Sequence, residues 1–216
     1  MNIAILIFDR LTALDAVGPY EVLSRLPGAK VTFVAERLGP KRTDTGQLAL
    51  IADATIAEFP SPDILVVPGG HGRVDLMNDG LVHEWLRAAH ETSTWTTSVC
   101  TGSLVLAGAG LLEGKRATSH WLALDELAQF GAEPISQRVV FDGKVVTAAG
   151  VSAGIDMALS LAARIAGEQA AQAIQLSIEY DPRPPFDVGS PDKAPAEIIR
   201  QVHAYARSQA HKHPFG

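Results

Sequence analysis

The stretch WTTSVCTGSLVLAGAGLL, residues 95–112, decides the fold of this chain. Its first five residues have the composition of a short buried strand, and its last eleven are the small and apolar residues of a closely packed helix. Cys100, the one cysteine of the sequence, lies at the junction between them. A strand that turns sharply into a helix at a nucleophilic residue is a nucleophile elbow, and the sequence predicts one here.

Apolar runs on the amino-terminal side of this stretch repeat the strand pattern. Residues 2–8, 31–36 and 63–67 are continuous and rich in β-branched side chains, as in strands covered on both faces. Helical spacing follows at 14–26 and 81–92, and Gly18-Pro19 is expected to interrupt the first helix or to mark its start. This alternation predicts an α/β fold: a mostly parallel, twisted, flavodoxin-like sheet with helices on both faces.

The carboxyl-terminal half predicts a hairpin and two helices. Asp142-Gly143 is a strong turn signal inside 135–150, and Ser152 and Gly167 are placed to cap a buried helix. The proline-rich segment 180–195 precedes a last helix at 196–210. Too few residues follow this segment to build a second core, so residues 1–216 are predicted to form a single domain with a flexible tail at 211–216.

Composition excludes several classes of function. The 216 residues are 47% hydrophobic and 19% charged, and no apolar run is long enough to cross a bilayer. The formal net charge of −6, without a Lys/Arg stripe, disfavours nucleic-acid binding. The amino terminus has no basic leader and a single cysteine forms no internal disulfide, so we expect a cytoplasmic protein without membrane association.

Two interpretations of Cys100 compete. A free cysteine is usually a buried, inert hydrophobe. At an elbow, however, the thiol meets the positive end of a helix, which favours the thiolate, and lies where open α/β sheets bind ligands. Gly69 and Gly70 end a neighbouring strand, and their N–H groups together with that of Thr101 would form an oxyanion nest. This setting favours a reactive cysteine.

The proton partner of such a thiol is open to several candidates. Asp15 follows the first strand among apolar neighbours, where burial would raise its pKa and keep a proton near neutral pH. Its structural alternative is a helix N-cap, and Glu21 competes for the same role. His71 and His120 remain possible because both lie near predicted strand ends, although we expect His120 to be structural. The remaining histidines are interpreted as ordinary residues: His83, His90, His203, His211 and His213.

Five motifs together resemble a known family. They are residues 14–23, 63–70, 98–121, 146–161 and 178–191. They are similar to the ThiJ/PfpI superfamily, which has the fold of class I glutamine amidotransferases, and within it to the isocyanide (isonitrile) hydratases. The resemblance runs nearly from end to end, and the segment YDPRPPFD at 180–187 is its least generic part.

This resemblance implies an activity and a site. Cys100 would be the nucleophile and Asp15 would handle the proton. The enzyme would be a lyase that hydrates organic isocyanides to N-substituted formamides through a thioimidate, without metal or cofactor, and it would be a homodimer. Residues implied to line the pocket or lie beside it are Thr101, Gly70, Gly150 and Val151.

Differences between this sequence and other members of the superfamily narrow the choice of activity. Thr101 occupies the place where peptidase-like members carry a histidine, and Asp15 stands where glyoxalase-like members have a glutamate. Regulators of this superfamily attach a DNA-binding region that we do not expect here. Two alternatives stay open: another cysteine-dependent enzyme of the superfamily, of glyoxalase or deglycase type, and a redox-sensing or ligand-binding protein.

Overall fold

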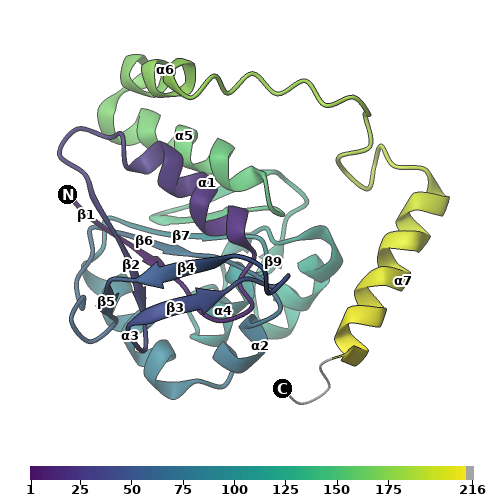
Figure 1. Cartoon of the computed structure of the whole chain (residues 1–216), viewed down its shortest axis with the longest axis horizontal. Coiled ribbons are helices and arrows are strands. Elements are labelled where there is room, and N and C mark those ends of the chain that lie inside the picture. The colour runs from purple at the N-terminus through teal and green to yellow at the C-terminus, as the bar shows by residue number, and fades with distance from the viewer. Residues whose placement is uncertain (213–216) are drawn as a thin grey trace. The chain divides into compact units, whose positions relative to one another are not determined.

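A seven-stranded sheet forms the centre of the computed structural model, which describes residues 1–212. All neighbouring strands in it are parallel except the pair β10 and β11. Figure 1 shows the arrangement. In spatial order the strands are β10 (Val139–Asp142), β11 (Val145–Ala148), β7 (Trp95–Val99), β6 (Ile64–Val67), β1 (Asn2–Leu6), β2 (Lys30–Ala35) and β5 (Ala54–Thr55).

The central strands are buried on both faces, as their apolar sequences predict. Every residue of β6 is buried, as are the last four residues of β1 and of β7. The fold class and the hairpin at Asp142-Gly143 are therefore confirmed. Parallel neighbouring strands have their carboxyl ends at the same edge of the sheet. The carboxyl ends of β1, β6 and β7 therefore lie together at one edge.

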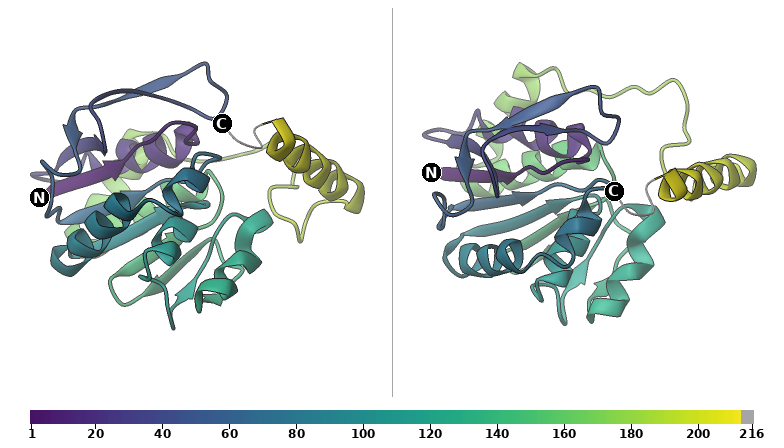
Figure 2. Two further views of the ribbon diagram at one scale, coloured as in Figure 1. Left: turned by 90° about the horizontal axis from the view of Figure 1, so that it is seen from below. Right: turned by 60° about the horizontal axis from the view of Figure 1, so that its bottom comes forward.

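Helices cover the two faces of the sheet in two groups (Figures 1 and 2). On one face α1 packs against α5, and α5 against α6. On the other face α4 packs against α2, α3 and the 3-10 helix η1. The first group is α1 (Ala13–Leu23), α5 (Ala153–Ala166) and α6 (Glu168–Ser177). The second group is α2 (Arg73–Leu76), α3 (Gly80–Thr92), α4 (Gly102–Gly108) and the 3-10 helix η1 (Trp121–Phe130).

The prediction for Gly18-Pro19 was wrong. Pro19 lies inside α1, which runs without a break from Ala13 to Leu23. Close packing against α5 explains the tolerance: a Cβ on Gly154 would lie 3.2 Å from the Pro19 ring, and one on Gly18 would lie 3.1 Å from Ile155. Tertiary packing of the two helices outweighs the local preference of proline for a helix end.

Several short elements were not predicted. An antiparallel ribbon joins β3 (Gly39–Arg42) to β4 (Ala49–Ala52), and a second small sheet pairs β8 (Arg116–Ala117) with β9 (Glu133–Pro134). Neither carries the long apolar run that marks a core strand. Helix α6 was also missed. The turn of the β3–β4 ribbon reaches the carboxyl edge of the sheet, because Leu11, just after β1, bridges to Thr43.

The chain divides into two compact units, Met1–Glu179 and Tyr180–Gly216. All buried hydrophobic residues among the described ones lie in the first unit, so the core is built there. The second unit contains the irregular segment 180–195 and α7 (Ala196–Lys212), as predicted for that segment and helix. The predicted tail at 211–216 begins within α7, and 213–216 lie outside the described residues. None of the described helices is long and apolar enough to span a bilayer.

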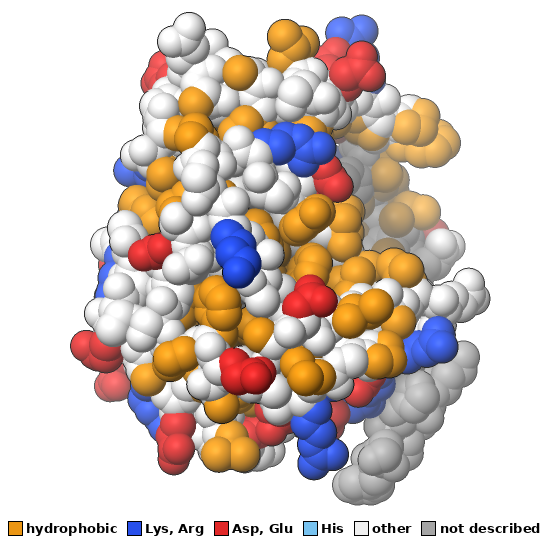
Figure 3. All heavy atoms as spheres, turned by 60° about the vertical axis from the view of Figure 1, so that its left-hand side comes forward, with side chains coloured by type: hydrophobic (Ala, Val, Ile, Leu, Met, Phe, Trp, Pro, Cys, Tyr) orange, Lys and Arg blue, Asp and Glu red, His pale blue; other side chains and the backbone are white. Residues whose placement is uncertain are grey.

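Charges are distributed evenly on the surface that Figure 3 shows. Lys and Arg side chains stand singly among Asp, Glu and hydrophobic side chains on that face. This pattern agrees with the absence of a basic stripe in the sequence.

Candidate active site

Cys100 occupies a strained turn between β7 and α4. Its φ is 59°, a left-handed conformation that is costly for a residue with a side chain. Its N–H donates to the carbonyl oxygens of Ala148 at 3.0 Å and Ala149 at 3.2 Å. Its own carbonyl accepts from the hydroxyls of Ser103 and Ser119, both at 3.2 Å. These four contacts hold the turn, and the predicted elbow is confirmed as a structure.

The packing behind the elbow requires glycine. A Cβ added to Gly102 would lie 2.0 Å from the carbonyl oxygen of Val67, so α4 begins in direct contact with the end of β6. This close approach brings the first turn of α4 against the β6 strand end, next to Gly69. The carboxyl ends of β6 and β7 therefore lie next to each other beside Cys100.

Asp15 reaches the same place from the first turn of α1. The residue has no exposed surface, and its Oδ2 accepts a 3.0 Å hydrogen bond from the Gly69 N–H. Thr12, not Asp15, is the N-cap of α1, so the capping alternative is wrong. Oδ1 is also buried and has no hydrogen-bond partner among the described residues. The carboxyl instead interacts with the Cys100 side chain.

The pair shares an electrostatic environment that favours neutral groups. Burial raises the pKa of Asp15 to about 7, against the lowering effects of the Gly69 N–H and the Cys100 side chain. Burial and then the Asp15 charge raise the pKa of the Cys100 thiol, while the Thr101 N–H lowers it. The helix-end effect expected to favour the thiolate is therefore outweighed, because α4 is short and the thiol is buried. Both shifts favour the protonated, neutral form of each group.

The prediction of an oxyanion nest needs correction, because hydrogen bonds within the protein occupy both glycine N–H groups. The Gly69 N–H is occupied by Asp15, and the Gly70 N–H donates to Oγ1 of Thr101 at 3.1 Å. Gly70 has a φ of 133°, which turns its N–H toward Thr101. Neither glycine N–H is free for a substrate in this structure. The two glycines position the acid and Thr101, and the Thr101 N–H faces the sulfur of Cys100.

The segment after β11 lies beside the elbow, as expected for Gly150 and Val151. Val151 packs against the small apolar cluster that includes Cys100. Gly150 lies against the ring of His120, since an added Cβ would be 2.2 Å from its Cδ2. His120 begins η1, and its Nδ1 accepts from the Leu122 N–H at 3.2 Å. Burial lowers the pKa of His120, which favours the neutral ring, and a neutral ring that accepts at Nδ1 has its proton on Nε2.

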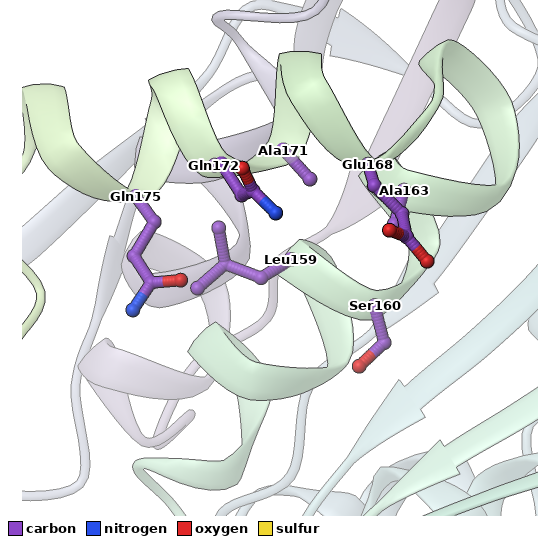
Figure 4. Close-up of a pocket in the computed structure, with 7 residues that line it drawn as sticks. All are labelled: Leu159, Ser160, Ala163, Glu168, Ala171, Gln172 and Gln175. Atoms are coloured by element: carbon purple, nitrogen blue, oxygen red, sulfur yellow. The ribbon is translucent and has the colours of Figure 1, made fainter.

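Other candidates lie elsewhere. Glu21 forms an ion pair with Arg25, just past the end of α1, and His71 is exposed at the start of the turn before α2. A shallow depression between α5 and α6, drawn in Figure 4, contains none of the predicted site residues. Sequence reasoning missed Ser119, which supports the elbow carbonyl, and Asp44, which lies on the β3–β4 turn. A lone serine or aspartate in a loop gives no signal of such contacts.

The chain belongs to the DJ-1/PfpI family, whose model matches residues 1–164. It is 45% identical over 206 residues to the isonitrile hydratase of Pseudomonas putida, covering 95% of this chain and 90% of that enzyme. A solved ThiJ/PfpI family protein from Pseudomonas syringae is 39% identical with a TM-score of 0.92, over 96% of this chain and 87% of that one. The family resemblance predicted from the motifs is confirmed.

A regulator also matches. The HTH-type transcriptional regulator CdhR of Pseudomonas aeruginosa is 33% identical over 177 residues, which are 80% of this chain. The match spans 52% of the regulator. The likeness therefore concerns about half of that protein.

Proposed function

We propose that this protein is an enzyme that hydrates organic isocyanides to N-substituted formamides, with Cys100 as nucleophile and Asp15 as the group that carries the proton. The observation that supports this most directly is the buried Asp15–Cys100 pair at the elbow. The 45% identity to an isonitrile hydratase over most of both chains supports the substrate class.

In the first step the sulfur attacks the terminal carbon of the isocyanide. Asp15 takes the thiol proton as the new S–C bond forms, and then delivers it to that carbon. The product is a thioimidate, Cys–S–CH=N–R. An Asp15 with a pKa of about 7 suits both halves of this transfer, because it is neither a strong acid nor a strong base near neutral pH.

In the second step water adds across the C=N bond, with hydroxyl on carbon and hydrogen on nitrogen. Collapse of the tetrahedral species breaks the S–C bond, the hydroxyl proton returns to the Asp15–Cys100 pair, and R–NH–CHO leaves. The sum is isocyanide plus water to formamide, without oxidant or cofactor. Covalent catalysis suits this substrate because water alone attacks the isocyanide carbon slowly.

The raised pKa of the thiol argues against the sensor alternative. Redox-sensing cysteines are exposed and have a high thiolate fraction, whereas Cys100 is 5% exposed and its pKa is raised. Activation of this thiol instead requires a base in contact with it, and Asp15 supplies one. No described contact favours the glyoxalase alternative over isocyanide hydration.

The test is product formation from a simple alkyl isocyanide, followed by mass spectrometry. The wild-type protein is expected to release the N-alkyl formamide, and Cys100→Ala to release none above the rate in buffer. Rapid quenching of the wild type should also trap a Cys100 adduct whose mass increase equals that of the isocyanide. Formamide production by Cys100→Ala at the wild-type rate would overturn the proposal.

We also propose a cytoplasmic homodimer. Large apolar side chains are exposed on and beside the β3–β4 ribbon, at Leu38, Leu48 and Ile51, which is suited to contact with a second copy. Light scattering on a size-exclusion column checks the assembly: a mass of one chain at micromolar concentration would contradict it.

A further inference from the structure

The turn of the β3–β4 ribbon is attached to the start of α1. Leu11 bridges to Thr43 on one side and to Gly70 on the other. The Asp44 N–H donates to the Leu11 carbonyl at 2.9 Å, and the Thr12 hydroxyl donates to Oδ2 of Asp44 at 2.8 Å. We name this last contact the Thr12–Asp44 latch. It links a surface ribbon to the helix that carries Asp15.

The latch uses a hydroxyl that would otherwise cap the helix. Thr12 is the N-cap of α1, yet its side chain makes no capping hydrogen bond. Its N–H donates to the Gly69 carbonyl at 2.9 Å, beside the glycine N–H that holds Asp15. Asp44 is therefore fixed to the same group of strand ends as the reacting pair.

We propose that Asp44 is a positioning and specificity-determining residue: the latch holds a negative charge beside the Asp15–Cys100 pair, so that the site accepts neutral electrophiles and disfavours anionic ones. The statement about substrates rests on the proposed function, and the electrostatic statement does not. Asp44 is exposed, and like charge near the path of an anion raises the free energy of its approach.

Asp44 also affects the ionisation of Asp15, in the direction that the proposal requires. Its charge raises the pKa of Asp15, as the smallest of the four contributions, because a second carboxylate disfavours ionisation of the first. An isocyanide is neutral, and Asp15 must both take the thiol proton and deliver it to carbon, so a pKa near 7 and repulsion of anions both suit this substrate.

Several charged groups around this region form ion pairs with residues other than Asp44. Arg10 pairs with Asp75 at 2.7 Å. The guanidinium of Arg42 stays on the turn that carries Asp44, where it donates to the Gly46 carbonyl at 3.3 Å. On α1 itself Glu21 pairs with Arg25, and on the adjacent α5 Asp156 pairs with Arg138. Among the described side chains Asp44 has no ion pair. Its carboxylate accepts from the Thr12 hydroxyl.

The test compares Asp44→Asn with the wild type, using alkylation of Cys100 by neutral iodoacetamide and by anionic iodoacetate. The amide oxygen of Asn keeps an acceptor for Thr12 but removes the charge. Cys100 is the one cysteine in the sequence, so intact-protein mass spectrometry reports its modification directly. The rate ratio of the two reagents, divided by the ratio for N-acetylcysteine, measures discrimination against the anion.

The ratio is expected to favour iodoacetamide in the wild type and to fall roughly three- to tenfold in Asp44→Asn, with the difference shrinking at 1 M salt. Asp53→Asn, at an exposed aspartate between β4 and β5, is the matched control and should leave the ratio unchanged. An Asp44→Asn ratio equal to the wild type overturns the proposal. Formamide production by unalkylated portions of the same preparations separates this failure from failure of the proposed function.

A second pair of variants tests the latch without touching the charge. Thr12→Val removes the hydroxyl and Thr12→Ser keeps it, so the serine variant should retain the wild-type ratio and the valine variant should not. Carboxyl ¹³C NMR gives a readout independent of thiol reactivity: the Asp15 titration midpoint should move down by a few tenths of a pH unit in Asp44→Asn. An unchanged midpoint together with equal Thr12→Val and Thr12→Ser ratios overturns the proposal.

Discussion

The Gly69 N–H donates to Oδ2 of Asp15 at 3.0 Å and so joins the end of β6 to the first turn of α1. This bond holds a buried carboxyl near Cys100, which follows the next strand along the sheet, and it leaves Oδ1 without a hydrogen-bond partner among the described residues. A buried acid on a helix is thus oriented by the backbone of a different element. The consequences can be measured.

Asp15 makes folding stability depend on pH. The folded-state pKa of about 7 exceeds the usual 3.8, so the folded protein binds more protons between these values and the free energy of unfolding falls as pH rises through that window. About three pKa units correspond to roughly 4 kcal/mol. Asp15→Asn removes this dependence. Urea unfolding at pH 4 and pH 8 should show a smaller difference in the variant than in the wild type.

The same variant should lose activity while remaining folded. An amide accepts the Gly69 hydrogen bond but cannot take up and release a proton, so formamide production is expected to fall at least 100-fold. Wild-type turnover in Asp15→Asn would remove Asp15 from the mechanism and direct attention to His120.

Thr101 should act through its hydroxyl. Thr101→Val leaves the Gly70 N–H without its acceptor, which costs about 1–3 kcal/mol of folding stability and loosens the strand end beside Cys100. Thr101→Ser keeps the acceptor. We expect the valine variant to unfold at lower urea concentration and to turn over more slowly, and the serine variant to resemble the wild type. Equal behaviour of the two variants would show that the hydroxyl is dispensable.

Gly102 should not tolerate a side chain. Gly102→Ala places a Cβ 2.0 Å from the Val67 carbonyl oxygen, and backbone must move on both sides of Cys100. Overpacking of this kind costs about 3 kcal/mol, and the elbow would lose its geometry. Gly80→Ala is the control, because nothing lies within 4 Å of its added Cβ. Calorimetry should show a lower melting temperature for Gly102→Ala and little change for Gly80→Ala.

Periodicity and composition predicted most of the framework. Buried parallel strands have continuous apolar runs, and Asp142-Gly143 marks a hairpin through local backbone preference, so both features are visible in short windows of sequence. Pro19 shows the limit of such windows. Its place inside α1 depends on contact with Gly154, which is far away along the chain.

The sequence by itself determined that Cys100 lies between a strand and a helix, because both patterns are local, and its family resemblance implied Asp15 as the partner. Only the tertiary structure decided how the pair is held. It placed Asp15 on the Gly69 N–H, used the Gly70 N–H for Thr101, and brought Asp44 to the start of α1. Burial then raised the pKa of the thiol that the local helix end alone would have lowered, since desolvation depends on everything that surrounds a group.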